Sequence, residues 1–263
     1  MAEIEYRDIH KAFDAPVLTG VSLTVASGET LSIVGPSGTG KSVLLKTTIG
    51  LILPDRGDVF VDGQSVVSAT REQLQAIRRK AGYVFQNAAL FDSMNVFENV
   101  SLGLLDEEIR SLGRPEVLRR VAAALEDVNL DAAQVLDKLP SELSGGMRKR
   151  VGLARAIVGQ PEILLYDEPV TGLDPVNSAA VDRLISAIAQ RMHVTSIVVT
   201  HDIEGAMTIS DRIALLAGGK LRFVGTPDQF RHSQEPLVRA FVDREAAFAA
   251  AAAKSEGGHE GMR

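Results

Sequence analysis

Residues 35–42, with the sequence GPSGTGKS, have the types and spacing needed to bind phosphate groups. They fit the pattern of glycine, four variable residues, glycine, lysine, and serine or threonine. Glycine permits a tight turn with inward-pointing N–H groups, and a following helix would present its N-terminus to the anion. We therefore expect ATP to bind here, with Lys41 on the β- and γ-phosphates and Ser42 on Mg²⁺. The predicted loop comprises Gly35, Pro36, Ser37, Gly38, Thr39, Gly40, Lys41 and Ser42.

A second candidate for chemistry is the acidic pair Asp167 and Glu168, which follows the apolar run at 163–166. Ligands bind at the carboxyl ends of strands in a doubly wound sheet. Asp167 is then expected to face Mg²⁺, and Glu168 to polarise an attacking water as a general base. Taken alone, the pair fits a polar strand end slightly better than a catalytic site. The phosphate loop in the same chain favours the catalytic interpretation.

The sequence LSGGM at residues 143–147 precedes a predicted helix over 147–158. Ser144 is a good N-terminal capping residue, and Gly145 and Gly146 leave backbone N–H groups exposed. A second helix N-terminus able to bind an anion is one interpretation, and a plain capped helix start is the other.

Together and in this order, these motifs resemble those of the ABC ATPases over about residues 3–232. LSGGM is similar to the family signature LSGGQ. The resemblance implies that Gln86 senses nucleotide and contacts water or metal, and that His201 contacts the γ-phosphate. It also implies that Asp174 communicates across a dimer and that Phe13 stacks on adenine.

Each of these four residues also has a simpler interpretation. Gln86 fits an exposed loop, and His201 fits the end of a strand. Asp174 precedes Pro175 and fits the start of a helix, where aspartate is favoured. Phe13 fits an aromatic residue packed in the core.

The resemblance also implies a second copy of the chain as partner. In ABC ATPases two cassettes face each other head to tail, and ATP lies between the phosphate loop of one and the signature of the other. This chain has one phosphate loop and one signature, Ser144, Gly145, Gly146 and Met147, so a homodimer is the simplest way to complete the site. A thioether cannot make the hydrogen bonds of an amide, so Met147 is not expected to take over the role of the usual glutamine.

The elements that position these residues alternate between short β-branched runs and helical patterns, which predicts an α/β fold with a largely parallel sheet. The resemblance implies a P-loop NTPase cassette with a RecA-like core, an antiparallel β subdomain and an inserted α-helical subdomain. We expect an ATPase domain over 1–235, its helical insert at about 87–160, and a C-terminal helical tail over 236–263 with a disordered end. Strands are predicted at 4–9, 21–25, 30–34, 59–61, 83–85, 162–167, 195–200, 212–216 and 220–224, and helices at 41–51, 71–80, 117–128 and 147–158.

Composition restricts the classes of function further. The 263 residues carry a net charge of −6, which argues against a nucleic-acid partner, and no cysteine, which excludes disulfides and zinc–thiolate sites. No apolar run approaches the roughly 18 residues that span a bilayer. We therefore expect a soluble chain that reaches a membrane only through a partner.

Residues 86–100, QNAALFDSMNVFENV, and Met147 resemble the MlaF group, the ATPases of envelope lipid transporters. That resemblance implies an MlaE-type permease, an MCE-domain protein and a possible STAS-domain subunit as partners, with phospholipid or another hydrophobic lipid as substrate. The chain would lie at the cytoplasmic face of the bacterial inner membrane, held there by the permease. Phe91, Met94 and Phe97 are either core residues or the lining of a groove for that permease.

Two alternatives stay open at this point. The same motifs suit the ATPase of another ABC importer or exporter, and they suit a non-transport ABC regulator of the cell-division type. In the tail, an apolar stripe fits either a packing face on the same domain or a contact with the second cassette or a regulatory partner; its residues are Leu237, Val238, Phe241, Val242 and Phe248.

Overall fold

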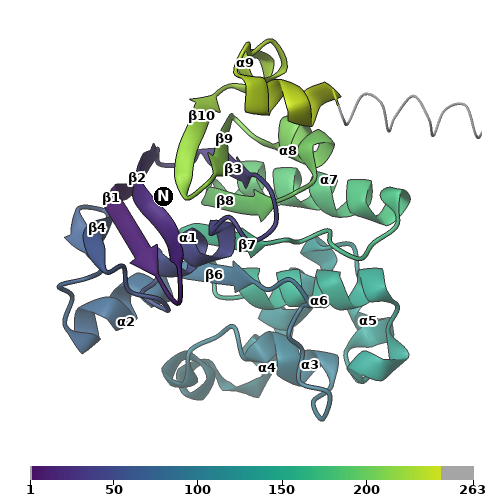
Figure 1. Cartoon of the computed structure of the whole chain (residues 1–263). Coiled ribbons are helices and arrows are strands. Elements are labelled where there is room, and N and C mark those ends of the chain that lie inside the picture. The colour runs from purple at the N-terminus through teal and green to yellow at the C-terminus, as the bar shows by residue number, and fades with distance from the viewer. Residues whose placement is uncertain (1, 244–263) are drawn as a thin grey trace, which may run out of the picture.

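The structure of the protein is a computed structural model, which describes residues 2–243. Its central sheet has six strands in the order β10-β9-β3-β8-β7-β6 (Figure 1). Neighbouring strands run parallel from β9 to β6, and β10 pairs antiparallel with β9 at one edge. The strands are β3 (Thr30–Val34), β6 (Ala81–Val84), β7 (Ile163–Asp167), β8 (Thr195–Thr200), β9 (Arg212–Ala217) and β10 (Lys220–Gly225).

The three central strands β3, β7 and β8 are buried along their whole length. Both faces of a parallel sheet are covered, so such strands are mostly apolar. Their polar residues, among them Thr30, Ser32, Thr195, Ser196 and Thr200, are buried as well. This burial explains the continuous apolar runs in the sequence, and the predicted α/β fold is confirmed.

A second, antiparallel sheet has the strand order β2-β1-β4-β5. It packs against the central sheet through one buried apolar cluster that includes Ile4, Leu31 and Leu165. The two-residue strand β5 was not predicted, because it is too short to show alternation. The strands are β1 (Ile4–Ala12), β2 (Pro16–Val25), β4 (Arg56–Val61) and β5 (Gln64–Ser65).

A group of helices lies between β6 and β7 in the sequence and forms the lower part of the molecule in Figure 1. The long helix α4 breaks at Gly113, where φ is 73° and ψ is 160°, and Pro115 follows. The predicted helix at 117–128 corresponds to its second half. The group comprises α3 (Val96–Ser101), α4 (Asp106–Asp127), α5 (Ala132–Val135), a 3₁₀ turn (Pro140–Glu142) and α6 (Gly145–Ile157).

The first helix, α1 (Lys41–Thr47), ends earlier than the predicted 41–51. The Thr48 N–H donates a hydrogen bond to the Leu45 carbonyl, three residues back, and Gly50 has a left-handed conformation with φ of 61°. The predicted helix included the apolar residues at 49 and 51, but the backbone leaves the helix before them. The helix α2 (Arg71–Arg79) has a complete capping box between Thr70 and Gln73.

The C-terminal part comprises α7 (Pro175–Met192), α8 (Ile203–Ile209) and α9 (Pro227–Arg231), followed by a helical segment at 236–243. Val238 is fully buried beside Phe230, and Phe241 and Val242 pack against the same cluster. These tail residues therefore provide a packing face on their own domain. Leu237 is 40% exposed, and Phe248 lies outside the described residues.

Candidate nucleotide-binding and catalytic site

The predicted phosphate loop connects β3 to α1, as its mechanism requires. Gly35 has φ of 151°, and a Cβ there would lie 2.1 Å from the Leu216 carbonyl oxygen. Gly40 has φ of 98°, and its Cβ would lie within 3 Å of Val17 and Leu18. Glycine is therefore required at both positions by conformation and by close approach.

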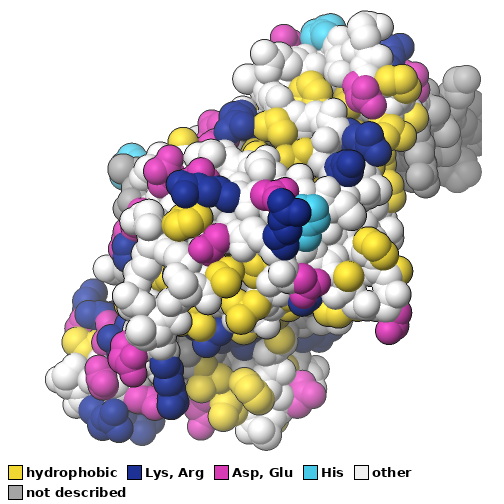
Figure 2. All heavy atoms as spheres, turned by 60° about the vertical axis from the view of Figure 1, so that its left-hand side comes forward, with side chains coloured by type: hydrophobic (Ala, Val, Ile, Leu, Met, Phe, Trp, Pro, Cys, Tyr) yellow, Lys and Arg dark blue, Asp and Glu magenta, His cyan; other side chains and the backbone are white. Residues whose placement is uncertain are grey.

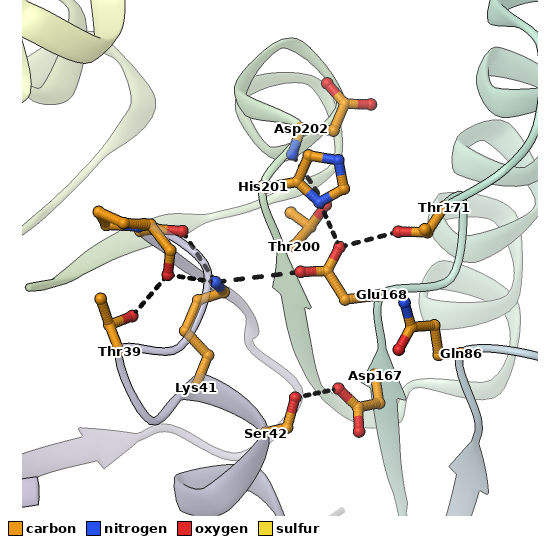
Figure 3. A network of polar contacts seen from close by, with 12 residues as sticks. Thr39, Lys41, Ser42, Gln86, Asp167, Glu168, Thr171, Thr200, His201 and Asp202 are labelled. Atoms are coloured by element: carbon orange, nitrogen blue, oxygen red, sulfur yellow. Dashed lines mark hydrogen bonds and ion pairs between the residues drawn. The ribbon is translucent and has the colours of Figure 1, made fainter. Parts of the chain in front are cut away.

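The Lys41 side chain is 6% exposed, and its ammonium lies inside the loop. It donates hydrogen bonds to the carbonyls of Gly35 at 2.8 Å and Pro36 at 3.0 Å, and it lies 3.9 Å from Glu168 Oε1. Burial lowers the pKa of Lys41, while the charges of Glu168 and Asp167 oppose that shift. The loop thus places one cation at the centre of the predicted phosphate site (Figure 3).

Asp167, at the end of β7, is held through both carboxylate oxygens. Ser42 Oγ donates to Oδ1 at 2.5 Å, and Tyr83 Oη donates to Oδ2 at 2.9 Å. The ammonium of Lys46 lies 3.8 Å from the same Oδ2. Burial, followed by the negative charge of Asp167, raises the pKa of Tyr83, so the phenol stays protonated as a donor. Tyr83 and Lys46 were not predicted, because only the folded chain brings them to Asp167.

Glu168 directly follows Asp167 and has a left-handed backbone with φ of 52°. Non-glycine residues rarely adopt this conformation, and such strain clusters at functional sites. Its Oε2 contacts His201 Nδ1 at 2.6 Å and accepts from the Thr171 hydroxyl at 3.0 Å. The backbone N–H of Glu168 donates to the Val199 carbonyl, which ties the residue to β8. Thr171, like Tyr83 and Lys46, is a residue of the site that no sequence motif indicated.

Gln86 follows β6 and has an exposed side chain, which Figure 3 shows on the same side as Asp167 and Glu168. Its backbone carbonyl accepts a short hydrogen bond from Lys149 of α6. Gln86 is therefore an exposed loop residue, as the simple interpretation expected, but its backbone is held in place by this hydrogen bond.

The signature residues Ser144, Gly145, Gly146 and Met147 start α6, and Ser144 Oγ accepts from the Met147 N–H at 3.2 Å. Asp174 caps α7 in the same way, accepting from the Asn177 N–H at 3.0 Å. The Asn177 side chain lowers the pKa of Asp174 and lies against Gly146, so it links the two helix starts. Among residues 2–243, none of the four signature residues makes a hydrogen bond or ion pair with the phosphate loop of its own chain.

Phe13 lies between β1 and β2 and is 60% exposed, which excludes the core interpretation. The start of β2 contacts Gly40, so the Phe13 turn borders the phosphate loop. Lys11 Nζ lies 5.5 Å from the Phe13 ring centroid, and Asp55 binds both Lys11 Nζ and the Ala12 N–H. An exposed aromatic ring on a fixed turn offers a flat face for a base.

Comparison with known proteins identifies the family. Residues 18–171 match the family model described as ABC transporter. The chain belongs to the ABC transporter family. The resemblance to the ABC ATPases seen in its motifs is confirmed.

Several relatives of this cassette are 38–40% identical to it. The probable ribonucleotide transport ATP-binding protein mkl of Mycobacterium tuberculosis is 39% identical over 241 residues, covering 91% of this chain and 66% of that protein. The chain thus spans just under two thirds of the length of this relative. The intermembrane phospholipid transport system ATP-binding protein MlaF of Escherichia coli is 38% identical over 227 residues, covering 86% and 83%. The sulfate/thiosulfate import ATP-binding protein CysA of Caulobacter vibrioides is 40% identical over 242 residues, covering 91% and 69%.

Solved structures agree with the assignment of the fold. A dimeric structure of MJ0796, a bacterial ABC transporter cassette, has a TM-score of 0.75 and 30% identity, covering 85% of this chain and 98% of that one. A dimeric post-hydrolysis state of the same cassette with ADP and Pi has a TM-score of 0.74. The predicted cassette fold is therefore confirmed.

Proposed function

We propose that this cassette powers the movement of phospholipid, or another hydrophobic lipid, between the inner membrane and the cell envelope. The observation that carries the proposal is the 38% identity to MlaF over 86% of the chain, which agrees with the MlaF-like sequence at 86–100 and Met147. The partners that this proposal requires are an MlaE-type permease and an MCE-domain protein, and a STAS-domain subunit is an optional third partner.

Hydrolysis is assigned to residues gathered around the phosphate loop. Lys41 can exchange the Gly35 and Pro36 carbonyls for phosphate oxygens with little movement of its stem. Glu168 accepts the proton of the attacking water, and its left-handed backbone, His201 and Thr171 fix the orientation of its carboxylate. The outer side of the exposed His201 ring is free to contact the γ-phosphate, and Gln86 orients the water.

Mg²⁺ fits the oxygen atoms at the end of β7. Ser42 Oγ and Asp167 Oδ1 are oxygen donors of the kind that Mg²⁺ prefers, and a hydrogen bond of 2.5 Å between them shows that both lie at the same place. Among the described residues there is no cluster of three or more acidic or histidine ligands. This agrees with magnesium sites that use one or two protein groups together with substrate phosphates. The bound ion would neutralise charge on the β- and γ-phosphates, and Gln86 would lie beside it.

The signature is assigned to the ATP of a second copy. Ser144, Gly145 and Gly146 present the N-terminus of the thirteen-residue helix α6 without contacting their own phosphate loop. The MJ0796 cassette is dimeric in both solved structures, which supports a dimer of this chain. Two ATP molecules would then join the two copies, each held by one phosphate loop and one signature, and Asp174 would lie at the junction.

The permease is assigned to an apolar groove of about 330 Å³ on the helical part. Met94, Phe97 and Leu102 line it together with Ile109 and Val117, while Phe91 nearby is 54% exposed. Phe97 therefore packs partly against the core and partly lines the groove. The face in Figure 2 carries hydrophobic side chains in its lower half among charges of both signs, which suits a protein partner more than a polyanion.

No helix within residues 2–243 is long and apolar enough to cross a membrane. We place the chain at the cytoplasmic face of the inner membrane, attached through the permease. Purification of the native complex, with partners and bound lipid identified by mass spectrometry, tests the proposal. An MCE protein, an MlaE-type permease and phospholipid support it. A solute-binding partner and no lipid would instead favour an importer like CysA, which is 40% identical to the chain.

A further inference from the structure

Helix α6 is hydrogen-bonded to the loop that carries Gln86. This loop, residues 86–91, is called the Q-loop here. Lys149 Nζ donates to the Gln86 carbonyl, and the Arg155 guanidinium donates to the carbonyls of Ala88 and Ala89, the latter at 2.7 Å. At 100° per residue, positions 149, 152 and 155 lie on one side of the helix within an arc of about 120°. The Q-loop backbone is therefore bound along one side of the signature helix.

The Q-loop backbone that Arg155 contacts is strained. Ala88 and Ala89 have φ of 59° and 47°, a left-handed conformation that alanine rarely adopts once and here adopts twice in succession. Such residues persist only where their surroundings enforce the conformation. Arg155 binds both carbonyls of this pair, so it is the group placed to enforce it.

Close packing makes the contact rigid. Ala88 is buried, and a Cβ built on Gly152 would lie 3.1 Å from its Cβ and 3.2 Å from its Cα. On the far side of the Q-loop, buried Asn99 accepts from the Phe91 N–H and donates to the Phe91 and Met94 carbonyls. The Q-loop thus lies between α6 and α3 and has little room to move independently of α6.

The same helix begins at Ser144, the proposed contact for the ATP of the partner. Arg155 lies eleven residues further, about 16 Å along the helix axis. One continuous helix therefore joins the ATP site of the second copy to the Gln86 of this copy's own site. Figure 1 shows α6 running beneath the β6 and β7 ends of the central sheet.

We infer that Lys149 and Arg155 are positioning residues that fix the Q-loop to the signature helix. ATP of the partner copy, bound at the signature of this chain, would then order Gln86 in this chain's own ATP site. The inference rests on the proposed ATP-sandwich dimer. It predicts that hydrolysis is cooperative in ATP and that the cooperativity passes through these two side chains.

The test compares Arg155→Met and Lys149→Met with the matched control Arg150→Met in the full chain. Arg150 is on the same helix, but it points to the Asn129 carbonyl at 3.4 Å and not to the Q-loop. Without nucleotide, amide hydrogen exchange of residues 86–91 should become at least about tenfold faster in the first two variants and stay unchanged in the control. Exchange as slow in both variants as in the control would overturn the inference. If Arg155→Met does not fold, Lys149→Met decides, because it retains Arg155.

Kinetics provide a readout that a merely structural role would not move. In Arg155→Met, kcat should fall about tenfold while KM for ATP changes less than twofold, because the phosphate loop is untouched. The Hill coefficient for ATP should fall towards 1, and Arg155→Lys should recover part of it. A Hill coefficient unchanged from the control would overturn the coupling role. If the proposed dimer does not form, the wild-type protein would hydrolyse ATP without cooperativity. The difference in amide exchange between the variants and the control would still be observed, so the two failures can be told apart.

Discussion

Tyr83→Phe should weaken the use of Mg²⁺ by this cassette without disturbing its fold. The hydroxyl of Tyr83 is one of two donors to Asp167, at 2.9 Å from Oδ2, while Ser42 occupies Oδ1. The ring packs on Phe85 with 4.5 Å between centroids, and phenylalanine keeps that contact. The substitution therefore removes one hydrogen bond and little else.

The magnitude follows from the charge of the acceptor. A hydrogen bond to an ionised group contributes about 1.5–3 kcal/mol. Lys46, 3.8 Å from the same Oδ2, retains part of the restraint on Asp167, so we expect the lower end of that range. This corresponds to roughly a tenfold rise in the Mg²⁺ concentration for half-maximal hydrolysis, in line with losses at groups that orient metal ligands.

The assay is a Mg²⁺ titration of ATP hydrolysis, paired with a titration of ATP binding at each Mg²⁺ concentration. Tyr166→Phe is the control on the neighbouring position of β7. Its hydroxyl faces that of Ser196 without a well-formed hydrogen bond, so its removal leaves the contacts of Asp167 intact. A Mg²⁺ requirement in Tyr83→Phe within twofold of that of Tyr166→Phe would refute the role of Tyr83.

Three further predictions concern one residue of α7, Asp182, and two residues of the candidate site, Phe13 and Thr171. Burial, and then the charge of Asp202, raise the pKa of Asp182 from an ordinary 3.8 to about 6, so ionisation destabilises the fold and stability falls as pH rises between about 4 and 6. Asp182→Asn should raise the free energy of unfolding at pH 7.5 by about 1 kcal/mol after allowance for solvent screening; urea unfolding that keeps the wild-type pH dependence would contradict this. Phe13→Ala should weaken ATP binding about tenfold through lost stacking, with the free energy of unfolding changed by less than about 0.5 kcal/mol; unchanged ATP affinity in a binding titration would exclude the adenine role. Thr171→Val should lower kcat about tenfold at constant KM, because Glu168 loses one donor; unaltered steady-state kcat would show that His201 alone orients the carboxylate.

Sequence reasoning succeeded where the physical cause is local. The run at 163–166 is apolar because β7 is buried throughout, and the phosphate loop at 35–42 needs glycine for the conformations that its pattern predicts. It failed at α1, where Gly50 ends a helix whose apolar residues continue, and at β5, which has only two residues. In both cases packing decides the boundary and periodicity does not.

The surroundings of the site could not be predicted for a different reason. Tyr83 is 84 residues from Asp167, and its hydroxyl reaches that carboxylate only because β6 and β7 pair in parallel. The left-handed backbone of Glu168 and of Ala88 is equally invisible, because neither glycine nor asparagine marks it. Motifs thus predict the groups that are expected to touch the nucleotide, while the groups that hold those side chains in place appear only in the folded chain.

The most direct test of the central claim, that two copies complete each ATP site, is the mass of Glu168→Gln in sedimentation equilibrium with saturating MgATP. We predict that the mass doubles relative to the nucleotide-free protein, because ATP binds and is not hydrolysed. The same protein with Ser144→Arg added should keep the mass of one chain, since its signature can no longer accept the partner's ATP. A Glu168→Gln protein that binds ATP and yet keeps the mass of one chain would contradict the account.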